Sequence, residues 1–370
     1  MIKISTKILI ISFGVKEFDG RLKELRDVIS RIGNYKIVCC SRSAGCNEEE
    51  YIVNIKDRKY LDIRNYIYFI CMCLKVAKDM KKIDVLVVDN MFATIPALII
   101  RKLINPNVII QDVRELYFYN EIKKGWARFI NKCETSLIRK SQIVLVANRQ
   151  RAEIMKKYYN LNKMPIVFEN IRFLTGEYDG AELNKKYEGM FKYKTNIIST
   201  GGLSVSRETH KLVDSMKYLT KDYGLFLLGD GSDEDKRLIH QIISDNNLEN
   251  IHFLGKVSMS ELRYIVKQCD IGMVHYHKND LNNKYCASGK IYEYLAEGLP
   301  VVTTENITLK ELCKDNNIGV ADDKFYEGIL KVSEDIEFYK NNVRKFISSV
   351  SVEDYNQSIS NEILRLIEEA

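Results

Sequence analysis

The chain has 370 residues, of which 46% are hydrophobic and 29% are charged. That length allows two ordinary domains with buried cores, and the charge content excludes a protein built mostly from membrane-spanning helices. The nine cysteines lack the spacing of a zinc site or a disulfide framework, so we expect reduced thiols in a cytoplasmic protein.

Charge is distributed unevenly along the chain. Residues 1–172 carry 32 Lys and Arg against 18 Asp and Glu, which is a net charge of +14. Because the formal net charge of the whole chain is +6, the remaining residues carry −8. A basic first half fits contact with an anionic membrane surface, or it is only a solvated Lys-rich face. The basic residues are not interleaved with aromatic residues in one strip, which argues against nucleic-acid binding. The apolar run at 66–74 is too short to span a bilayer.

The first half alternates short β-branched runs with helical stretches. This alternation predicts βαβ units and a parallel sheet. The predicted strands are 7–12, 35–41, 84–89, 107–112, 141–147 and 165–170.

The second half repeats the alternation, so we expect a second parallel sheet and an α/β fold with two Rossmann-like domains. The predicted strands are 196–202, 224–231, 250–255, 269–276 and 299–304. The expected domains are 1–172 and 195–350, with a Gly-containing linker at 173–194. The final helix, 351–370, either crosses back to the first domain or simply caps the second.

Ligands of such folds bind beyond the carboxyl ends of the strands, and "STGGLSVSR" (199–207) lies at one such end. Gly201 and Gly202 let backbone approach a ligand, and Arg207 precedes a helix, which together suit an anion. The alternative is an ordinary strand-to-helix turn with a surface arginine.

A second turn, "LLGDGSDEDK" (227–236), has Gly229 and Gly231 but lacks the third glycine of a dinucleotide-binding motif. A nicotinamide-dependent oxidoreductase is therefore excluded. Acidic residues occupy the following helix start, where they complement the helix dipole and would repel phosphate. We expect only close backbone approach here.

The stretch "SGKIYE" (288–293) places Ser288 and Gly289 before a helix that begins near Lys290. Free amides, the helix dipole and the ammonium group of Lys290 then converge on one point, which suits a diphosphate. Glu293 lies one turn deeper on the same face, where its carboxylate can accept hydrogen bonds from ribose hydroxyls. The alternative is a plain salt bridge between residues three apart.

The order of these motifs resembles the donor domain of GT-B glycosyltransferases, most closely the family 4 group, which includes bacterial enzymes of cell-surface polysaccharide synthesis. The resemblance covers about 196–320 and includes "FLGKV" (253–257), "CDIGMV" (269–274) and "KIYEYLAEGLPVV" (290–302). Tyr285 stands where many relatives have a second glutamate, and Gly202 stands where many have arginine.

The resemblance implies roles for individual residues. Arg207 and Lys290 would hold the donor diphosphate and act in catalysis, and Glu293 would bind the ribose. Lys256 and Val257, with Gly255, would border the nucleobase. His275 would face the sugar or the phosphates.

The implied activity is hexosyl transfer from a nucleoside-diphosphate sugar to a hydroxyl of a glycan acceptor. The resemblance also implies retention of the anomeric configuration, and fixed cations with helix amides would make a metal or other cofactor unnecessary. The basic first half suggests that the acceptor is lipid-linked and presented at an anionic membrane surface. The enzyme would work in the cytoplasm, bound peripherally to the inner membrane.

The first domain would supply the acceptor side and any side-chain base. Asp19, Asp112 and Glu115 follow predicted strands and are the candidates for that base. Arg21 and Arg114 lie beside them in sequence, and Gly14 would let backbone approach a sugar. A self-contained salt-bridge cluster around Asp112, Arg114 and Glu115 is the alternative.

Two further functions remain open on sequence grounds. A sugar-nucleotide epimerase has the same two-domain build, although "SGKIYE" fits the transferase pattern better. A non-catalytic sugar-nucleotide-binding subunit is the other, and Tyr285 in place of glutamate is its only support.

Overall fold

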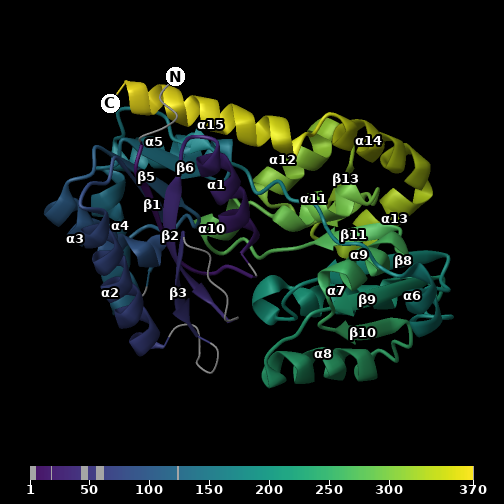
Figure 1. The fold of residues 1–370 in the computed structure, drawn as a ribbon. Coiled ribbons are helices and arrows are strands. Elements are labelled where there is room, and N and C mark those ends of the chain that lie inside the picture. Colours follow the sequence, from purple (N-terminus) through teal and green to yellow (C-terminus); the bar gives the residue numbers. More distant parts are fainter. Residues whose placement is uncertain (1–5, 18, 43–48, 56–61, 123–124, 370) are drawn as a thin grey trace. The chain divides into compact units, whose positions relative to one another are not determined.

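The computed structural model describes residues 6–17, 19–42, 49–55, 62–122 and 125–369. The chain divides into two compact units, shown in Figure 1. The first comprises Met1–Asn170 and Val352–Ala370, and the second comprises Ile171–Ser351. Each unit has one parallel sheet with helices, which confirms the expected α/β fold class.

The first unit contains a seven-stranded sheet in the order β3-β2-β1-β4-β5-β6-β7, with every strand pair parallel. Its strands are β1 (Ile8–Val15), β2 (Tyr35–Ser41), β3 (Glu50–Asn54), β4 (Val85–Asp89), β5 (Val108–Val113), β6 (Ile143–Val146) and β7 (Ile166–Val167). Ile10 lies in the middle of this sheet and pairs with Ile37 on one side and Val87 on the other. The long Ile and Val runs fit a sheet that is buried on both faces.

Helices cover both faces of this sheet. They are α1 (Gly20–Ser30), α2 (Ile63–Met80), η1 (Met91–Ala93), α3 (Thr94–Ile104), α4 (Trp126–Ile138), α5 (Arg149–Tyr159) and α15 (Val352–Glu368). One apolar core joins the sheet to α1 and α15, and the other joins it to α2 and α3. Helix α15 is held to this unit, since Asn356 donates to Glu24 at 2.9 Å and Ser360 donates to the Val28 carbonyl at 3.0 Å.

The second unit contains a six-stranded parallel sheet in the order β10-β9-β8-β11-β12-β13. Its strands are β8 (Thr195–Thr200), β9 (Tyr223–Leu228), β10 (Ile251–Gly255), β11 (Ile271–Val274), β12 (Val301–Thr303) and β13 (Gly319–Ala321). Its helices are α6 (Gly180–Lys186), η2 (Val205–Arg207), α7 (Thr209–Ser215), η3 (Met216–Tyr218), α8 (Asp233–Asp245), α9 (Met259–Lys267), α10 (Leu281–Lys284), α11 (Gly289–Ala296), α12 (Ile307–Asn316), α13 (Phe325–Glu334) and α14 (Ile336–Ser348).

Residues 173–194, which we expected to be a linker, are instead part of the second unit. They contain α6, which contacts α9. Tyr187 donates to Glu261 on α9 at 2.6 Å, and its ring stacks on Tyr264. Aromatic packing rather than β periodicity fixes this segment, which explains why the sequence pattern suggested a linker.

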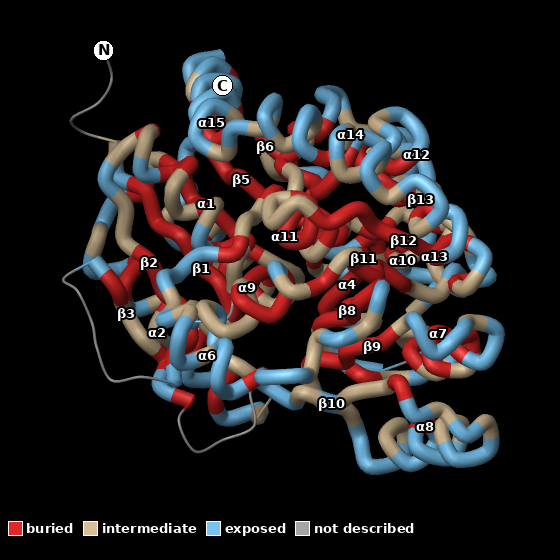
Figure 2. Tube along the Cα trace, turned by 90° about the vertical axis from the view of Figure 1, so that its right-hand side faces the viewer, coloured by how far each residue is buried: buried red, intermediate tan, exposed pale blue. Residues whose placement is uncertain are grey.

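Burial follows the sheets, whose central strands are the most buried segments of each unit (Figure 2). The eight described cysteines are free thiols. Over the described ranges, no helix combines the length and the apolar character that crossing a membrane requires.

Candidate functional site

The first turn of α11 is the centre of the candidate site in the second unit. Ser288 is the N-cap residue, but its side chain does not cap the helix. Its hydroxyl instead accepts a hydrogen bond from Tyr276 at 3.1 Å. The helices α8 and α9 differ, because Ser232 and Ser258 cap them with side-chain hydrogen bonds. The amides at the start of α11 therefore remain open to an anion.

Three cations gather around this helix start. Lys290 donates to the carbonyl oxygen of Thr200, at the end of β8. Arg207 and Arg172 lie close enough that their charges act on Lys290. Burial is the main cause that lowers the pKa of Lys290 to about 7, and the Arg207 charge lowers it further. Within the described part of the chain, neither Lys290 nor Arg207 has a carboxylate within salt-bridge distance.

Glu293 lies one turn along α11 and is nearly buried. Its Oε1 atom is 2.7 Å from Nε of Arg172, which is its ion-pair partner. Arg172 also covers the helix start, because a Cβ at Gly289 would lie 2.6 Å from Arg172 Nε. The site thus combines three positive charges, one carboxylate and an open helix N-terminus.

The glycines of the two neighbouring loops serve mainly to pack those loops together. A Cβ at Gly229 would overlap the carbonyl oxygen of Gly201, and a Cβ at Gly231 would overlap that of Leu203. Gly201 has a φ of +103° and lies against the Lys290 side chain. Gly229 and Gly231 were expected to bind the donor through close backbone approach, and the backbone that lies against them is that of the adjacent loop. Gly202 has only the Arg207 side chain near it, at 3.6 Å.

His275 is buried, and both of its ring nitrogens are occupied. Nε2 lies 2.8 Å from the Ser199 hydroxyl, and Nδ1 bonds to the carbonyl oxygen of Arg207. Because a carbonyl only accepts, Nδ1 carries the proton and Nε2 accepts from Ser199. Burial lowers the pKa of His275 to about 4, so the ring is neutral. This differs from the expectation that His275 faces the donor, since its nitrogens instead hold the backbone of Arg207.

The residues expected around the nucleobase follow β10. Lys256 is exposed, and its Nζ lies 3.3 Å from Asp230 on the neighbouring loop. Val257 is partly buried. Tyr285 ends the short helix α10, three residues before Ser288.

In the first unit, Arg114 joins two of the carboxylates at the ends of the strands. It donates to both oxygens of Asp19, at 2.8 and 2.7 Å, and to both oxygens of Asp89, at 2.5 and 2.6 Å. Asp19 also caps α1 through Leu22 N. A Cβ at Gly14 would lie 2.6 Å from Asp19. The Asp19 carboxylate therefore fills the space beside Gly14 in which we expected a sugar to approach the backbone.

Asp112 has no exposed surface and forms a bidentate pair with Arg21, at 2.7 and 2.6 Å. Arg21 also donates to the carbonyl of Phe168 and to Asn170, each at 2.7 Å. A fully buried, paired carboxylate cannot reach a substrate proton, so the structure argues against Asp112 as the base. The expected cluster of Asp112, Arg114 and Glu115 is instead two separate networks.

Two glutamates remain near the Arg114 network. Glu115 is exposed and Glu134, on α4, is 5% exposed. Both line a pocket of about 200 Å³ together with Gly14, Asp19 and Arg114. Glu134 and Arg172 were not predicted from the sequence, because each reaches its site from outside a recognisable motif.

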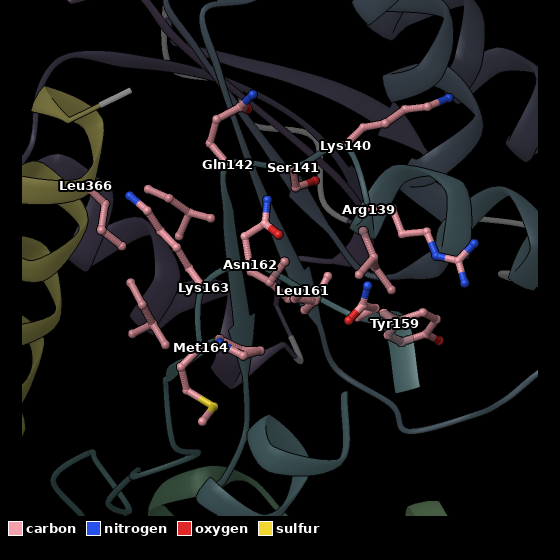
Figure 3. A pocket seen from close by; sticks show the side chains of 16 residues that line it. Arg139, Lys140, Ser141, Gln142, Tyr159, Leu161, Asn162, Lys163, Met164 and Leu366 are labelled. Carbon is pink, nitrogen blue, oxygen red and sulfur yellow. The ribbon is translucent and has the colours of Figure 1, made fainter. Parts of the chain in front are cut away.

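A larger pocket of about 720 Å³ lies at the opposite, amino ends of β6 and β7 (Figure 3). Arg139, Lys140 and Lys163 line it. The first two follow the end of α4, where cations complement the helix dipole. None of the residues singled out from the sequence lies in this pocket.

Residues 194–335 match the family described as glycosyl transferases group 1. This segment contains the loops after β8 and β9 and all of α11. Over this segment the chain is similar to group 1 glycosyltransferases. No curated protein sequence matches it.

Solved structures show that the chain has the GT-B fold along its whole length. HepE of Anabaena, in complex with UDP and glucose, is 15% identical, with a TM-score of 0.72 over 97% of this chain and 99% of that one. WaaG, a glycosyltransferase of lipopolysaccharide biosynthesis, is 13% identical, with a TM-score of 0.66 over 98% and 99%. UDP-GlcNAc 2-epimerase of Neisseria meningitidis is 12% identical, with a TM-score of 0.60 over the full length of both chains.

Proposed function

We propose that this protein is a glycosyltransferase that moves a sugar from a UDP-sugar to a hydroxyl of a lipid-linked glycan, without a metal and with retention of anomeric configuration. The observation that carries the donor part is the pair Arg207 and Lys290 beside the uncapped start of α11. Cations without carboxylate partners, at a helix N-terminus, bind a diphosphate. The UDP complex of HepE supports the choice of nucleotide.

The costly step is the departure of the nucleoside diphosphate, because negative charge builds up on it. The acceptor oxygen forms a bond to the anomeric carbon while the bond from that carbon to the diphosphate breaks. Arg207, Lys290 and the amides of Gly289 and Lys290 stabilise the departing charge as fixed electrostatic groups. The acceptor proton goes to the leaving phosphate, so the step needs no side-chain base. This is the form of the reaction that retention implies.

The nucleoside occupies the same face of the second unit. Glu293 accepts from the ribose hydroxyls, since a carboxylate that pairs with Arg172 through Oε1 keeps further lone pairs free. Backbone groups of Lys256 and Val257 border the base.

Calorimetry in the presence of a chelator tests the donor site. Titrations with UDP, GDP, dTDP and CMP are compared between the wild type and Glu293→Ala. We expect UDP to bind most tightly and the variant to lose at least tenfold in affinity. Failure of all four nucleotides to bind would overturn the proposal.

The membrane part rests on an exposed group in the first unit, Ile63 and Ile67 of α2 with Trp126 and Phe129 of α4, which we call the aromatic patch. Trp126 and Phe129 are 53% and 52% exposed, and their rings stack at 5.4 Å. Exposed Trp and Phe on a domain with a net positive charge favour the interface of an anionic bilayer. The patch also adjoins the small pocket, because Tyr66 contacts both Trp126 and Phe92.

Liposome sedimentation tests this attachment on the cytoplasmic leaflet. We expect the protein to bind anionic vesicles at low salt and Trp126→Ala/Phe129→Ala to bind at least fivefold less. Phe338→Ala, which removes an exposed ring from the second unit, is the matched control. Equal binding of both variants would remove the patch from the proposal.

Product analysis distinguishes the transferase from the epimerase and from a non-catalytic subunit. The likeness to the UDP-GlcNAc 2-epimerase shows a shared fold only. We expect an acceptor-dependent glycoside whose anomeric configuration, read by NMR, matches that of the donor. An altered sugar nucleotide formed without an acceptor would indicate the epimerase, and UDP binding without any turnover would indicate the subunit.

A further inference from the structure

The small pocket of the first unit lies where β1, β4 and β5 end. Its volume is about 200 Å³. At ~30 Å³ per water molecule, that is room for roughly six water molecules or for one sugar ring. Its lining includes Asp19, Met91, Phe92, Arg114, Glu115 and Glu134. It therefore offers apolar walls and carboxylates side by side.

Glu134 differs from the other carboxylates at this place. Asp19 and Asp89 are both held by Arg114. Glu134 is 5% exposed, and among the described residues it has neither a hydrogen-bond partner nor an ion-pair partner. Burial raises the pKa of Glu134 to about 8, and the charge of Glu115 contributes to the rise. A buried carboxyl without a partner is costly unless a ligand supplies one.

We propose that this pocket binds a neutral sugar ring at the acceptor end of the substrate, and that Glu134 accepts a hydrogen bond from one of its hydroxyls. The inference rests on the proposed function and specifies the acceptor. Phe92 and Met91 supply apolar surface for the carbon face of the ring. The hydroxyl supplies the donor that Glu134 lacks.

The charge of the pocket decides against an anionic sugar. Asp19 and Glu115 line the pocket with two negative charges, and Arg114 lines it with one positive charge. Asp89, which is buried and pairs with Arg114, adds a further carboxylate behind the lining. A uronic acid or a phosphorylated sugar would meet net repulsion in this site. A neutral hexose or an N-acetylhexosamine meets none.

Binding is expected to depend on pH because a donated hydrogen bond favours the carboxylate form of Glu134. A ligand that binds this form lowers the pKa of the group and releases a proton. Affinity for the sugar should therefore increase as the pH rises from 6.5 to 8.5. Glu134→Gln cannot ionise and should show no such dependence.

The probes are short-chain alkyl glycosides used below their micelle concentrations, with binding read by saturation-transfer NMR. The panel contains octyl β-glucoside, β-galactoside, β-mannoside and N-acetyl-β-glucosaminide, with octyl β-glucuronide as the anionic member. The proteins are the wild type, Glu134→Gln, Glu134→Leu and the control Glu153→Gln, which changes an exposed glutamate on α5. UDP affinity is measured by calorimetry on the same preparations.

We expect at least one neutral glycoside to bind the wild type and the control, with affinity that increases with pH. Glu134→Leu should weaken it at least tenfold, and the glucuronide should not bind. Normal UDP binding without binding of any neutral glycoside, or unchanged binding by Glu134→Leu, would overturn this inference and leave the donor proposal intact. If the wild type did not bind UDP at all, the donor proposal would be overturned instead.

A titration without ligand is independent of the choice of sugar. Carboxyl ¹³C NMR of labelled glutamate should show one resonance, absent in Glu134→Gln, that titrates near pH 8. Titration of Glu134 near pH 4 would contradict the buried, unpartnered carboxyl on which the inference depends.

Discussion

Arg172 and Glu293 form an ion pair, with 2.7 Å between Nε and Oε1, directly over the start of α11. Arg172 lies far from α11 in sequence, and it enters the site as the second residue of the second unit. Its position makes Gly289 necessary, because a Cβ there would lie 2.6 Å from Arg172 Nε. The carboxylate proposed to bind the ribose is therefore oriented by a cation that also faces the proposed diphosphate.

Arg172→Ala should weaken UDP binding about tenfold, or about 1.4 kcal/mol, since it removes a cation near the diphosphate and frees Glu293 to turn away. The matched control is Arg263→Ala. Arg263 pairs with Glu297 at the other end of α11, with the same 2.7 Å between Nε and Oε1. Calorimetry should show unchanged affinity for that control. Equal losses in the two variants would mean that Arg172 acts only on the stability of the helix.

Nucleotide binding should weaken as the pH rises above 7. Lys290 has a pKa of about 7 in the free protein, so it loses its charge above that pH. A bound diphosphate favours the ammonium form and raises the pKa, which means that binding takes up a proton. We expect up to a tenfold loss of UDP affinity per pH unit between 7 and 9.

Two Lys290 variants separate the charge from the side chain. Lys290→Arg keeps a cation at every pH in this range and should flatten the profile. Lys290→Met should lose about 10- to 100-fold at pH 7, as expected for a charge-assisted hydrogen bond. Calorimetry in buffers of different ionisation enthalpy measures the proton uptake directly. A flat wild-type profile would place Lys290 outside the binding site.

The sequence pattern predicted eleven strands that the structure contains, and it missed β3 and β13. Most of the predicted strands are Ile, Val and Leu runs that are buried in a parallel sheet, whereas the edge strand β10 is only partly buried. β13 has only three residues, Gly319–Ala321, and β3 begins with a charged residue, Glu50. Neither segment was recognised as a strand, whereas the two-residue edge strand β7 was, because Ile166 and Val167 stand in the apolar run 165–168.

The candidate site was predictable only where it follows a motif. "SGKIYE" identified Lys290 and Glu293, because a helix start fixes the relative position of its own residues. Arg172 and Glu134 depend on contacts between distant segments, which no local spacing encodes. The same limit explains Asp112, whose buried partner Arg21 is 91 residues away in sequence.

His275 should act on the donor through Arg207. His275→Ala removes the hydrogen bond to the Arg207 carbonyl and the link to Ser199, so UDP affinity should fall about tenfold. Arg207→Ala should weaken binding at least as much, and the double variant should lose no more than Arg207→Ala alone. Additive losses in this double-mutant cycle would show that His275 contacts the nucleotide independently.

Asp112→Asn should destabilise the first unit rather than impair chemistry. The change leaves Arg21 buried without its bidentate partner, and breaking a buried pair costs about 3–5 kcal/mol. Thermal unfolding should show a clear decrease in Tm, while UDP affinity, which depends on the second unit, should not change. An unchanged Tm together with a large loss of kcat would restore Asp112 as a candidate base.

Glu134→Gln should stabilise the protein at neutral and alkaline pH. Glutamate in the unfolded chain ionises near pH 4.3, whereas Glu134 in the folded protein has a pKa of about 8. Between these values the folded state holds a proton that the unfolded state has lost, so the stability of the wild type decreases as the pH rises from about 4 to 8. The variant lacks this contribution. Its Tm should match that of the wild type near pH 4.5 and exceed it by several degrees at pH 8, while Glu153→Gln should follow the wild type throughout.

A natural residue that lowers stability at the working pH is a mark of a ligand-binding group, because a purely structural position would gain from the amide. Parallel Tm curves for the wild type and Glu134→Gln would instead indicate that Glu134 is already satisfied in the folded protein.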